Sequence, residues 1–248
     1  MVTIGEIRMA TIERPGDPLT KKVIHVPNPE YSELWGHVYN FLNEKTNPSS
    51  PLGNDYPKHI NPYFGYFGEQ FHPILRQPHH FHLGIDLASP IKKPVYSSLE
   101  GILEYSGFHV GNGNYVMISH PDIVTEDGFM LYTLYMHLRD LKVGFSKYQK
   151  MLREISLRSY PNISITRDTL IGTVGESGNA KGMYPHVHLQ CEFRHKDGTI
   201  IAIDPAPILG IESQVNRTAT LNTEEEFLRL YETDKKNICD HCVEKYWK

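Results

Sequence analysis

The chain has 248 residues, of which 40% are hydrophobic and 22% charged, and its formal net charge is −4. This length and composition are typical of a globular protein that buries a sizeable core, either in one domain with appendages or in two small domains. The charge balance does not favour nucleic acid or an anionic membrane as a partner, because either would call for a clustered basic surface. No apolar run is long enough to span a bilayer, so we expect the chain not to be transmembrane.

The sequence leaves the export route and the redox compartment open. Residues 1–22 contain no continuous apolar segment after a basic start, so a secretory signal is not visible. The three cysteines make an odd count, and a disulfide framework is therefore not expected. Cys239 and Cys242 form a C-x-x-C pair that would suit a redox pair, half of a zinc knuckle or one local disulfide, although a polar C-terminal tail is the preferred interpretation.

The N-terminal part of the chain predicts an extended arm followed by one helix. Residues 2–29 carry short apolar pieces among prolines, a pattern typical of an arm with an edge strand. Residues 47–57 are rich in Pro, Ser, Asn and Gly and predict a linker. Between them a helix is predicted from Ser32 to about Asn43, because apolar residues recur there at helical spacing: Leu34, Trp35, Val38, Phe41 and Leu42.

From Asn61 onward the sequence predicts antiparallel β-structure. Short segments of β-branched and aromatic residues alternate with turn residues, and Gly-Asn-Gly-Asn at 111–114 predicts a tight turn. Further helices are predicted at 142–160 and from Thr223. The fold is therefore expected to be mainly β, an antiparallel sheet or sandwich with peripheral N- and C-terminal helices. The predicted strands are 95–96, 101–105, 115–118, 131–138, 169–172 and 186–193.

Two separated segments carry the residues best suited to chemistry. His82-Leu-Gly-Ile-Asp86 is followed about a hundred residues later by His186-Val-His188. Alternate residues of a strand share a face, so His186 and His188 are expected to point the same way. Imidazole and carboxylate both bind zinc, and a catalytic site with three protein ligands keeps a fourth position for water. The sequence therefore predicts one Zn²⁺ held by three of these side chains, with the neighbouring histidine acting on what the metal activates.

Each motif is weak alone, but the two occur together with a third histidine, His137, in Tyr-Met-His-Leu. Taken in order, the motifs resemble those of lysostaphin/LytM-type zinc endopeptidases, which cleave peptide cross-links of bacterial peptidoglycan. The resemblance covers residues 63–209. It rests on the segments Phe67-Gly68, His72-Pro-Ile74, His82–Ala88, Gly113–His120, Leu134–Leu138, Ile171–Gly178 and Pro185–Leu189.

This resemblance implies His82, Asp86 and His188 as zinc ligands and gives His137 and His186 to catalysis. Such chemistry is physically reasonable, since zinc lowers the pKa of a bound water from ~15.7 to about 7 and polarises a carbonyl. A histidine titrates near neutrality, so one of the pair could take up the proton of the water.

The resemblance also implies a domain organisation, a substrate and a location. We expect an N-terminal arm, helix and linker at 1–60, a metallopeptidase domain of the duplicated hybrid motif type at 61–210, and a C-terminal helix and tail at 211–248. The implied substrate is peptidoglycan peptides, and the implied location is periplasmic or extracellular. Protein partners are left open.

The chain departs from the family pattern at three places that would border the substrate. Glu69-Gln70 stands where relatives often carry an arginine, Lys92-Lys93-Pro94 stands where a Gly-Thr-Pro turn is usual, and the segment 142–167 is longer than the usual loop. None of them touches the five implied site residues, so they bear on which bond is cleaved. The remaining histidines named by the motifs are interpreted as surface residues or as neighbours of the site residues: His72, His79, His80, His109 and His120.

Three alternatives compete with a zinc peptidase. A non-catalytic LytM-like binding or regulatory module would be expected to lose metal ligands. A histidine phosphoryl carrier of the sugar-phosphotransferase type would not need Asp86. A purely structural zinc site normally takes four protein ligands, and only three are evident here.

Overall fold

A computed structural model of the chain describes residues 9–13, 23–27, 32–53, 65–72, 77–144 and 163–211, with side chains from residue 36 onward apart from those at 69–72 and 77–80. The predicted helix at 142–160 lies mostly, and that from Thr223 wholly, outside these residues, as do Cys239 and Cys242. Within the described residues, no helix is both long and apolar enough to cross a membrane.

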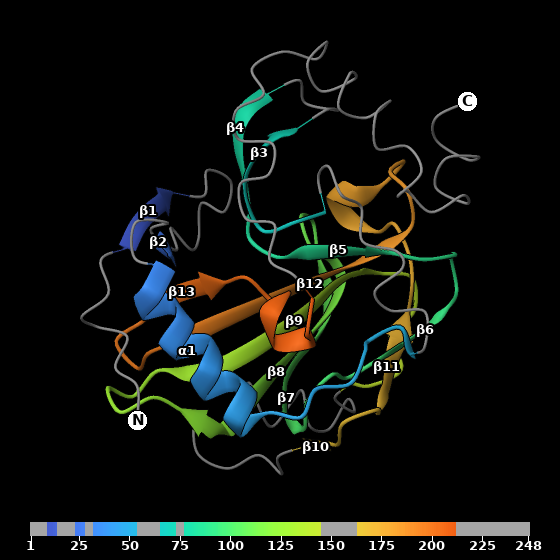
Figure 1. Cartoon of the computed structure of the whole chain (residues 1–248). Coiled ribbons are helices and arrows are strands. Elements are labelled where there is room, and N and C mark those ends of the chain that lie inside the picture. The colour runs from blue at the N-terminus through green and yellow to red at the C-terminus, as the bar shows by residue number, and fades with distance from the viewer. Residues whose placement is uncertain are drawn as a thin grey trace.

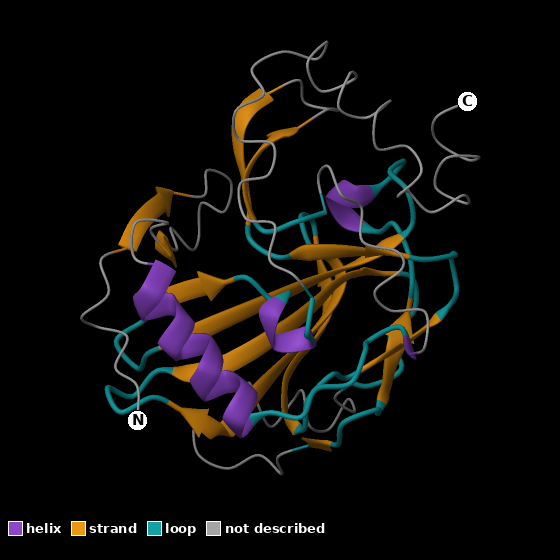
Figure 2. Ribbon diagram, viewed as in Figure 1, coloured by secondary structure: helices purple, strands orange, loops and turns teal. Residues whose placement is uncertain are grey.

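One nine-stranded sheet dominates the structure (Figures 1 and 2). Its strands follow the order β1-β2-β13-β12-β9-β8-β7-β10, and β5 pairs with the half of β12 that β13 leaves free. The described pairs are antiparallel except for β2 and β13, which run parallel. The bounds are β1 Met9–Glu13, β2 Val23–Pro27, β5 Ile85–Ala88, β7 Gly101–His109, β8 Gly113–Val124, β9 Met130–Leu138, β10 Ser164–Ile165, β12 His186–Arg194 and β13 Ile200–Ile203.

The remaining elements flank this sheet. They are α1 (Ser32–Lys45), the hairpin of β3 (Gly68–His72) and β4 (Gln77–His82), the pair of β6 (Pro94–Tyr96) and β11 (Leu170–Thr173), and the short 3-10 helices η3 (Gly178–Ala180) and η4 (Pro207–Leu209). The expected mainly β fold is confirmed, as are the helix beginning at Ser32 and the strand positions. The turn predicted at 111–114 joins β7 to β8.

The hydrophobic core covers one face of the sheet. Val187 and Leu189 of β12 belong to one buried cluster, and Cys191 and Phe193 of the same strand belong to a second. Helix α1 lies across the sheet (Figure 1) and contributes buried Val38 and Leu42 to the second cluster. Because side chains alternate along a strand, the even-numbered residues of β12, which include His186 and His188, occupy the opposite face.

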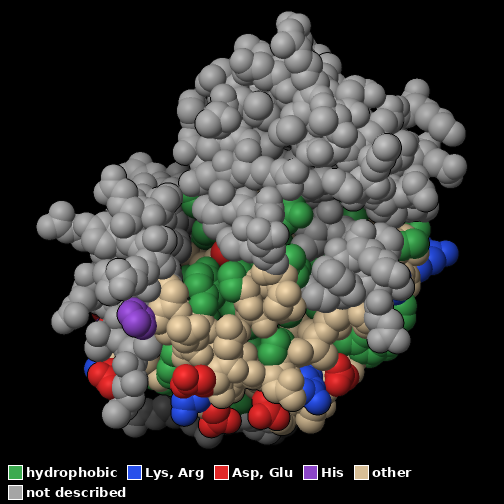
Figure 3. Space-filling model, in the orientation of Figure 1, with side chains coloured by type: hydrophobic (Ala, Val, Ile, Leu, Met, Phe, Trp, Pro, Cys, Tyr) green, Lys and Arg blue, Asp and Glu red, His purple; other side chains and the backbone are tan. Residues whose placement is uncertain are grey.

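Acidic and basic side chains are interspersed on the described part of the surface shown in Figure 3, without one sign of charge dominating that face. This distribution agrees with the small formal net charge of the whole sequence, −4.

His120 lies in the interior, so its interpretation as a surface residue or a neighbour of the site is wrong. Only 1% of it is exposed, and its ring is held by the Glu100 carbonyl at 2.6 Å from Nδ1 and by Thr133 Oγ1 at 3.0 Å from Nε2. His109, by contrast, is exposed as expected. Burial lowers the pKa of His120 from 6.5 to about 4, because the protonated ring would lose its hydration there.

Replacing His120 by glutamine is expected to flatten the acid side of the stability profile. The folded chain has the lower pKa, so the unfolded chain binds the extra proton first and stability falls as the pH drops from about 6.5 to about 4. That difference corresponds to about 3 kcal/mol, which His120→Gln should remove from the loss measured by urea unfolding between pH 7 and 4. Thr133→Val is the matched control, because it removes one hydrogen bond but keeps the imidazole and therefore the slope. Equal slopes in parent and His120→Gln would contradict the assignment.

Candidate metal centre

Strand register brings Asp86 and His188 together. β5 pairs antiparallel with β12 so that Asp86 lies directly opposite His188, and side chains opposite each other in an antiparallel pair share a face. His188 Nδ1 lies 2.9 Å from Asp86 Oδ1, and both residues are buried. Residues a hundred positions apart in the sequence are thus placed in contact by one short strand pair.

His82 completes the group from the last position of β4. Its Nε2 lies 3.2 Å from Asp86 Oδ1 and 2.9 Å from His188 Nδ1. The three atoms form the one group of candidate metal ligands found among the described residues. Tetrahedral zinc with bonds of about 2.0–2.1 Å separates its ligand atoms by about 3.3 Å, which is close to the spacing seen here. The three ligands implied by the resemblance therefore converge on one point.

Gly84 makes room for this convergence. It lies between the two ligands of the H-x-G-I-D motif, and a Cβ at this position would lie 2.7 Å from His188 Nε2 and 2.3 Å from the Leu189 carbonyl oxygen. Real side chains do not approach backbone oxygen so closely, so any substitution must shift β5 or the His188 ring. The glycine of the motif thus serves the metal centre through its lack of a side chain.

We expect Gly84→Ala to weaken zinc binding about 10- to 100-fold, the range typical of disturbed support around metal ligands. Competition against a chromogenic chelator measures this directly. Gly36→Ala is the control, because a Cβ at Gly36 of α1 meets nothing within 4 Å and should leave zinc affinity unchanged. Parent-like affinity in Gly84→Ala would show that the close approach is not needed.

His186 and His137 lie beside the three ligands. His186 shares the face of His188, as predicted from the alternation along the strand, and its Nε2 lies 3.7 Å from Asp86 Oδ1. The His137 ring lies 5.1 Å from that of His186 and 5.8 Å from that of His188, measured between centroids. All five residues proposed from the sequence therefore form one cluster.

A left-handed backbone directs His137 into this cluster. Strict alternation along β9 would place His137 on the face opposite Met136, which pairs with His188. However, the pairing of β8 with β9 shifts between Asn114 and Val116, and His137 has a φ of 62°. Such a bulge re-aims a side chain, and histidine is among the residues that tolerate positive φ. The backbone N–H of His137 is paired with the Asn112 carbonyl, which fixes the bulge.

Hydrogen-bond partners fix the tautomers of three of the four histidines directly. The Nδ1 atoms of His82, His137 and His186 lie 2.8–2.9 Å from the carbonyl oxygens of Tyr66, Ser177 and Tyr184. A carbonyl oxygen only accepts, so each Nδ1 must carry the proton and each Nε2 presents a lone pair. For His82 this lone pair faces the other two ligand atoms.

The three ligand atoms fit a divalent cation because of the lone pairs and the negative charge that they present to one point. Around the point of convergence lie the lone pair of His82 Nε2, the carboxylate oxygen of Asp86 and Nδ1 of His188, all within hydrogen-bonding distance of one another. Groups that present lone pairs and negative charge to each other repel unless a cation lies between them. Two imidazole nitrogens and one carboxylate oxygen are a typical zinc set with a position left for a further ligand.

The electrostatics of the cluster keep its members in the states that bind metal and accept protons. Burial raises the pKa of the Asp86 carboxyl, but the neighbouring rings of His82, His186 and His188 outweigh it and hold that pKa well below its usual range. Burial lowers the pKa of His137 well below its usual value, with a further contribution from His186 and His188, and it also lowers the pKa of His188. His137 and His188 are therefore neutral at pH 7 and Asp86 is ionised.

The sequence analysis missed Tyr184. Its hydroxyl donates to Asp86 Oδ2 at 3.1 Å, and its ring packs 4.8 Å from that of His186. Only 2% of this residue is exposed. Its position two residues before His186 was the available signal, since alternation extended by one step places residue 184 on the face of the ligands. Tyr184 holds the second carboxylate oxygen, which leaves Oδ1 to face the histidines.

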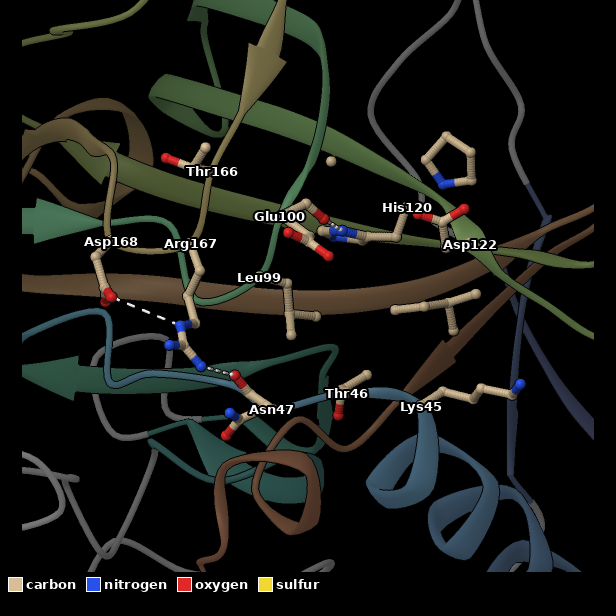
Figure 4. Close-up of a pocket in the computed structure, with 13 residues that line it drawn as sticks. Lys45, Thr46, Asn47, Leu99, Glu100, His120, Asp122, Thr166, Arg167 and Asp168 are labelled. Carbon is tan, nitrogen blue, oxygen red and sulfur yellow. Dashed lines mark hydrogen bonds and ion pairs between the residues drawn. The ribbon is translucent and has the colours of Figure 1, made fainter.

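A cavity of about 460 Å³ lies away from this centre (Figure 4). It is lined by the end of α1 at Lys45 and by His120 in the second half of β8, whereas the His137 backbone binds the Asn112 carbonyl in the turn that precedes β8. On its rim Arg167 binds the Asn47 carbonyl at 2.8 Å and pairs with Asp168. Both nitrogens of His120 are already bonded. The cavity therefore holds none of the proposed site residues.

Comparisons with known proteins relate the middle of the chain to a family of peptidases. Peptidase family M23 matches residues 80–202. The chain is 35% identical over 124 residues to the DD-carboxypeptidase/endopeptidase Mpg of Neisseria meningitidis, a match that covers 50% of this chain and 23% of that protein. It is 32% identical over 123 residues to the peptidoglycan DD-endopeptidase ShyA of Vibrio cholerae, covering 49% of this chain and 22% of that protein. The matched part is thus less than a quarter of each of these curated relatives.

Among solved structures, lysostaphin from Staphylococcus simulans is similar with a TM-score of 0.44 and 23% sequence identity, over 66% of this chain and 55% of that one.

The fold and the site define a mainly β protein with a candidate His-Asp-His metal centre. Through its domain at residues 80–202 the chain is a member of peptidase family M23, and the resemblance to lysostaphin/LytM-type endopeptidases is confirmed.

Proposed function

We propose that this protein is a zinc metalloendopeptidase that hydrolyses peptide bonds in the stems or cross-bridges of bacterial peptidoglycan. The observation that carries the proposal is the convergence of His82 Nε2, Asp86 Oδ1 and His188 Nδ1 with two further histidines beside them. The relatives Mpg and ShyA, named as peptidoglycan-directed or DD-peptide-directed enzymes, support the substrate class. Action on peptidoglycan would place the protein in the periplasm or outside the cell.

In this proposal His82, Asp86 and His188 hold the zinc ion. A bound zinc ion would polarise the scissile carbonyl and lower the pKa of a water molecule to about 7. The protein's own contribution at these positions is orientation. The Tyr66 carbonyl directs His82 Nε2 inward, and Tyr184 holds Asp86 through its outer oxygen.

His137 and His186 supply proton transfer and hydrogen bonding. Both present an unprotonated Nε2, because their Nδ1 atoms donate to the carbonyls of Ser177 and Tyr184. One Nε2 takes up a proton of the attacking water, and the resulting imidazolium donates a hydrogen bond to the tetrahedral oxyanion and then gives its proton to the leaving amine as the peptide C–N bond breaks. The low pKa of His137 keeps it available as the proton acceptor at neutral pH.

The competing functions lack support from the site. A non-catalytic module has no use for five assembled side chains with fixed tautomers, and a phosphoryl carrier has no need of Asp86, whose carboxylate faces His82 and His188 at the centre of the cluster. The ligand set offers three protein ligands, which is one fewer than a structural zinc site normally takes.

Digestion of purified peptidoglycan tests the proposal. The full chain, loaded with zinc, is incubated with peptidoglycans of several cross-link chemotypes, and the released fragments are identified by mass spectrometry. We expect new peptide termini with at least one chemotype, loss of release on treatment with a zinc chelator, and recovery on adding zinc back. Binding to peptidoglycan without release would support the non-catalytic module instead, and chelator-resistant release would exclude a zinc mechanism.

A further inference from the structure

A row of buried, hydrogen-bonded polar side chains continues from the metal centre along β12. Gln190, Glu192 and Arg194 follow His188 at every second position, so they share its face of the sheet. Gln190 is 1% exposed and Glu192 is 3% exposed. Burying a carboxylate costs several kcal/mol unless it is paired and hydrogen-bonded, so this arrangement calls for a reason.

Each side chain of this polar row contacts the next. The Arg194 guanidinium binds Glu192 Oε2 through Nε at 2.7 Å and Nη2 at 2.6 Å, and it lies 4.8 Å from the centre of the Tyr132 ring. The Gln190 amide nitrogen donates to the other oxygen of Glu192. The Gln190 amide oxygen lies 3.4 Å from His188 Nε2. The row of polar side chains thus begins at the positive charge of Arg194 and ends on His188, a proposed zinc ligand.

The order of charges fixes the direction of every hydrogen bond. Glu192, paired with Arg194, is ionised and can only accept, so Gln190 must turn its NH₂ group toward Glu192. The amide oxygen of Gln190 then faces His188 Nε2. Because that oxygen only accepts, it favours a proton on His188 Nε2, which frees the lone pair on Nδ1 to face a cation held between His188, Asp86 and His82.

His188 differs from the other three histidines of the cluster in this respect. Those three donate to backbone carbonyls, which no substitution can remove. The partner of His188 is the side chain of Gln190. The orientation of Gln190 depends on Glu192, and the orientation of Glu192 depends in turn on Arg194. The metal-binding state of His188 is therefore set by the sequence of β12 beyond the H-x-H motif.

We propose that Gln190, oriented by the Glu192–Arg194 ion pair, is a positioning residue that fixes the tautomer and ring orientation of His188 for zinc. The inference rests on the proposed function for the identity of the metal. It assigns no contact with substrate to Gln190, Glu192 or Arg194.

The test compares a variant in which these hydrogen bonds are broken with a variant in which their order is reversed. Gln190→Leu removes the acceptor for His188 and leaves Glu192 without its amide donor, and zinc affinity should fall about 10- to 100-fold. The double variant Gln190→Glu with Glu192→Gln keeps every bond satisfied in the opposite order. Its carboxylate at position 190 accepts from His188 and from the amide at position 192, and that amide's oxygen accepts from Arg194. It should bind zinc within a fewfold of the parent.

Two measurements separate positioning from stability and from the proposed function. Zinc affinity is obtained by chelator competition, and the Nε2–H group of His188 is observed by ¹⁵N NMR of the zinc-loaded protein. We expect a slowly exchanging Nε2–H in the parent and in the double variant, and faster exchange of this proton in Gln190→Leu. Thr133→Val, which also removes a buried hydrogen bond, should lower stability but keep zinc affinity.

Parent-like zinc affinity and unchanged exchange of the His188 Nε2–H in Gln190→Leu would overturn the proposal. If the parent binds zinc but cleaves no peptidoglycan, the proposed function fails and the positioning role stands on the affinities. If the parent binds no zinc, both the proposed function and the positioning role fail.

Discussion

Asp86→Asn is expected to lose zinc almost completely while keeping the fold. Asparagine has nearly the same shape as aspartate but carries no charge, so the variant presents a neutral amide where Oδ1 of Asp86 faces His82, His186 and His188. Loss of a direct ligand should weaken binding by more than about 100-fold, the upper end of what disturbed support around a ligand causes. Metal analysis of protein purified from zinc-containing medium, together with chelator competition, measures the loss.

Tyr184→Phe is the matched control for Asp86→Asn. It removes only the hydroxyl that donates to Asp86 Oδ2, so it should weaken zinc binding about 10- to 100-fold and leave the ligands in place. Stoichiometric, tightly held zinc in Asp86→Asn would remove Asp86 from the ligand set and with it the proposed metal centre.

His137→Asn should keep its zinc and lose most of its hydrolytic activity. Asparagine tolerates the positive φ at this position, so the bulge in β9 survives, whereas alanine would add backbone strain to the loss of the ring. Removing a group that moves a proton in the transition state costs about 10²- to 10⁴-fold, and the fall should appear in kcat with the zinc content unchanged. The rate of fragment release from peptidoglycan and metal analysis of the same samples measure the two quantities.

His109→Asn controls for the general effect of losing a histidine near this hairpin. His109 is exposed at the end of β7, close to the turn whose Asn112 carbonyl holds the His137 backbone, and its loss should leave both zinc and activity in place. Full activity in His137→Asn would exclude His137 from proton transfer. Loss of zinc in that variant would instead give His137 a structural role at the metal.

The five residues of the cluster could be proposed because short motifs carry them and the order of these motifs resembles a known family. His186 and His188 stand at a spacing that a strand places on one face, and both lie on β12, whereas His82 and Asp86 lie on two different strands, β4 and β5. The mainly β fold and the α1 helix followed from the spacing of apolar residues in the same way. The missed and mistaken assignments involve contacts between distant segments. Tyr184 was missed because its partner is on β5, and His120 was misplaced because its ring is held by Glu100, just before β7, and by Thr133 of β9.

By itself the sequence predicted the fold class from hydrophobic periodicity, and its motifs supplied the candidate ligands, because both are local properties; the role proposed for each residue came from the resemblance to lysostaphin/LytM-type endopeptidases. Tertiary structure alone decided how these parts meet. The pairing register of β5 with β12 places Asp86 against His188, and a one-residue slip would turn one of them to the other face. The left-handed backbone at His137 reverses the face that simple alternation assigns to it. The first depends on pairing between strands about a hundred residues apart and the second on a break in the register of β8 with β9, and local sequence patterns encode neither.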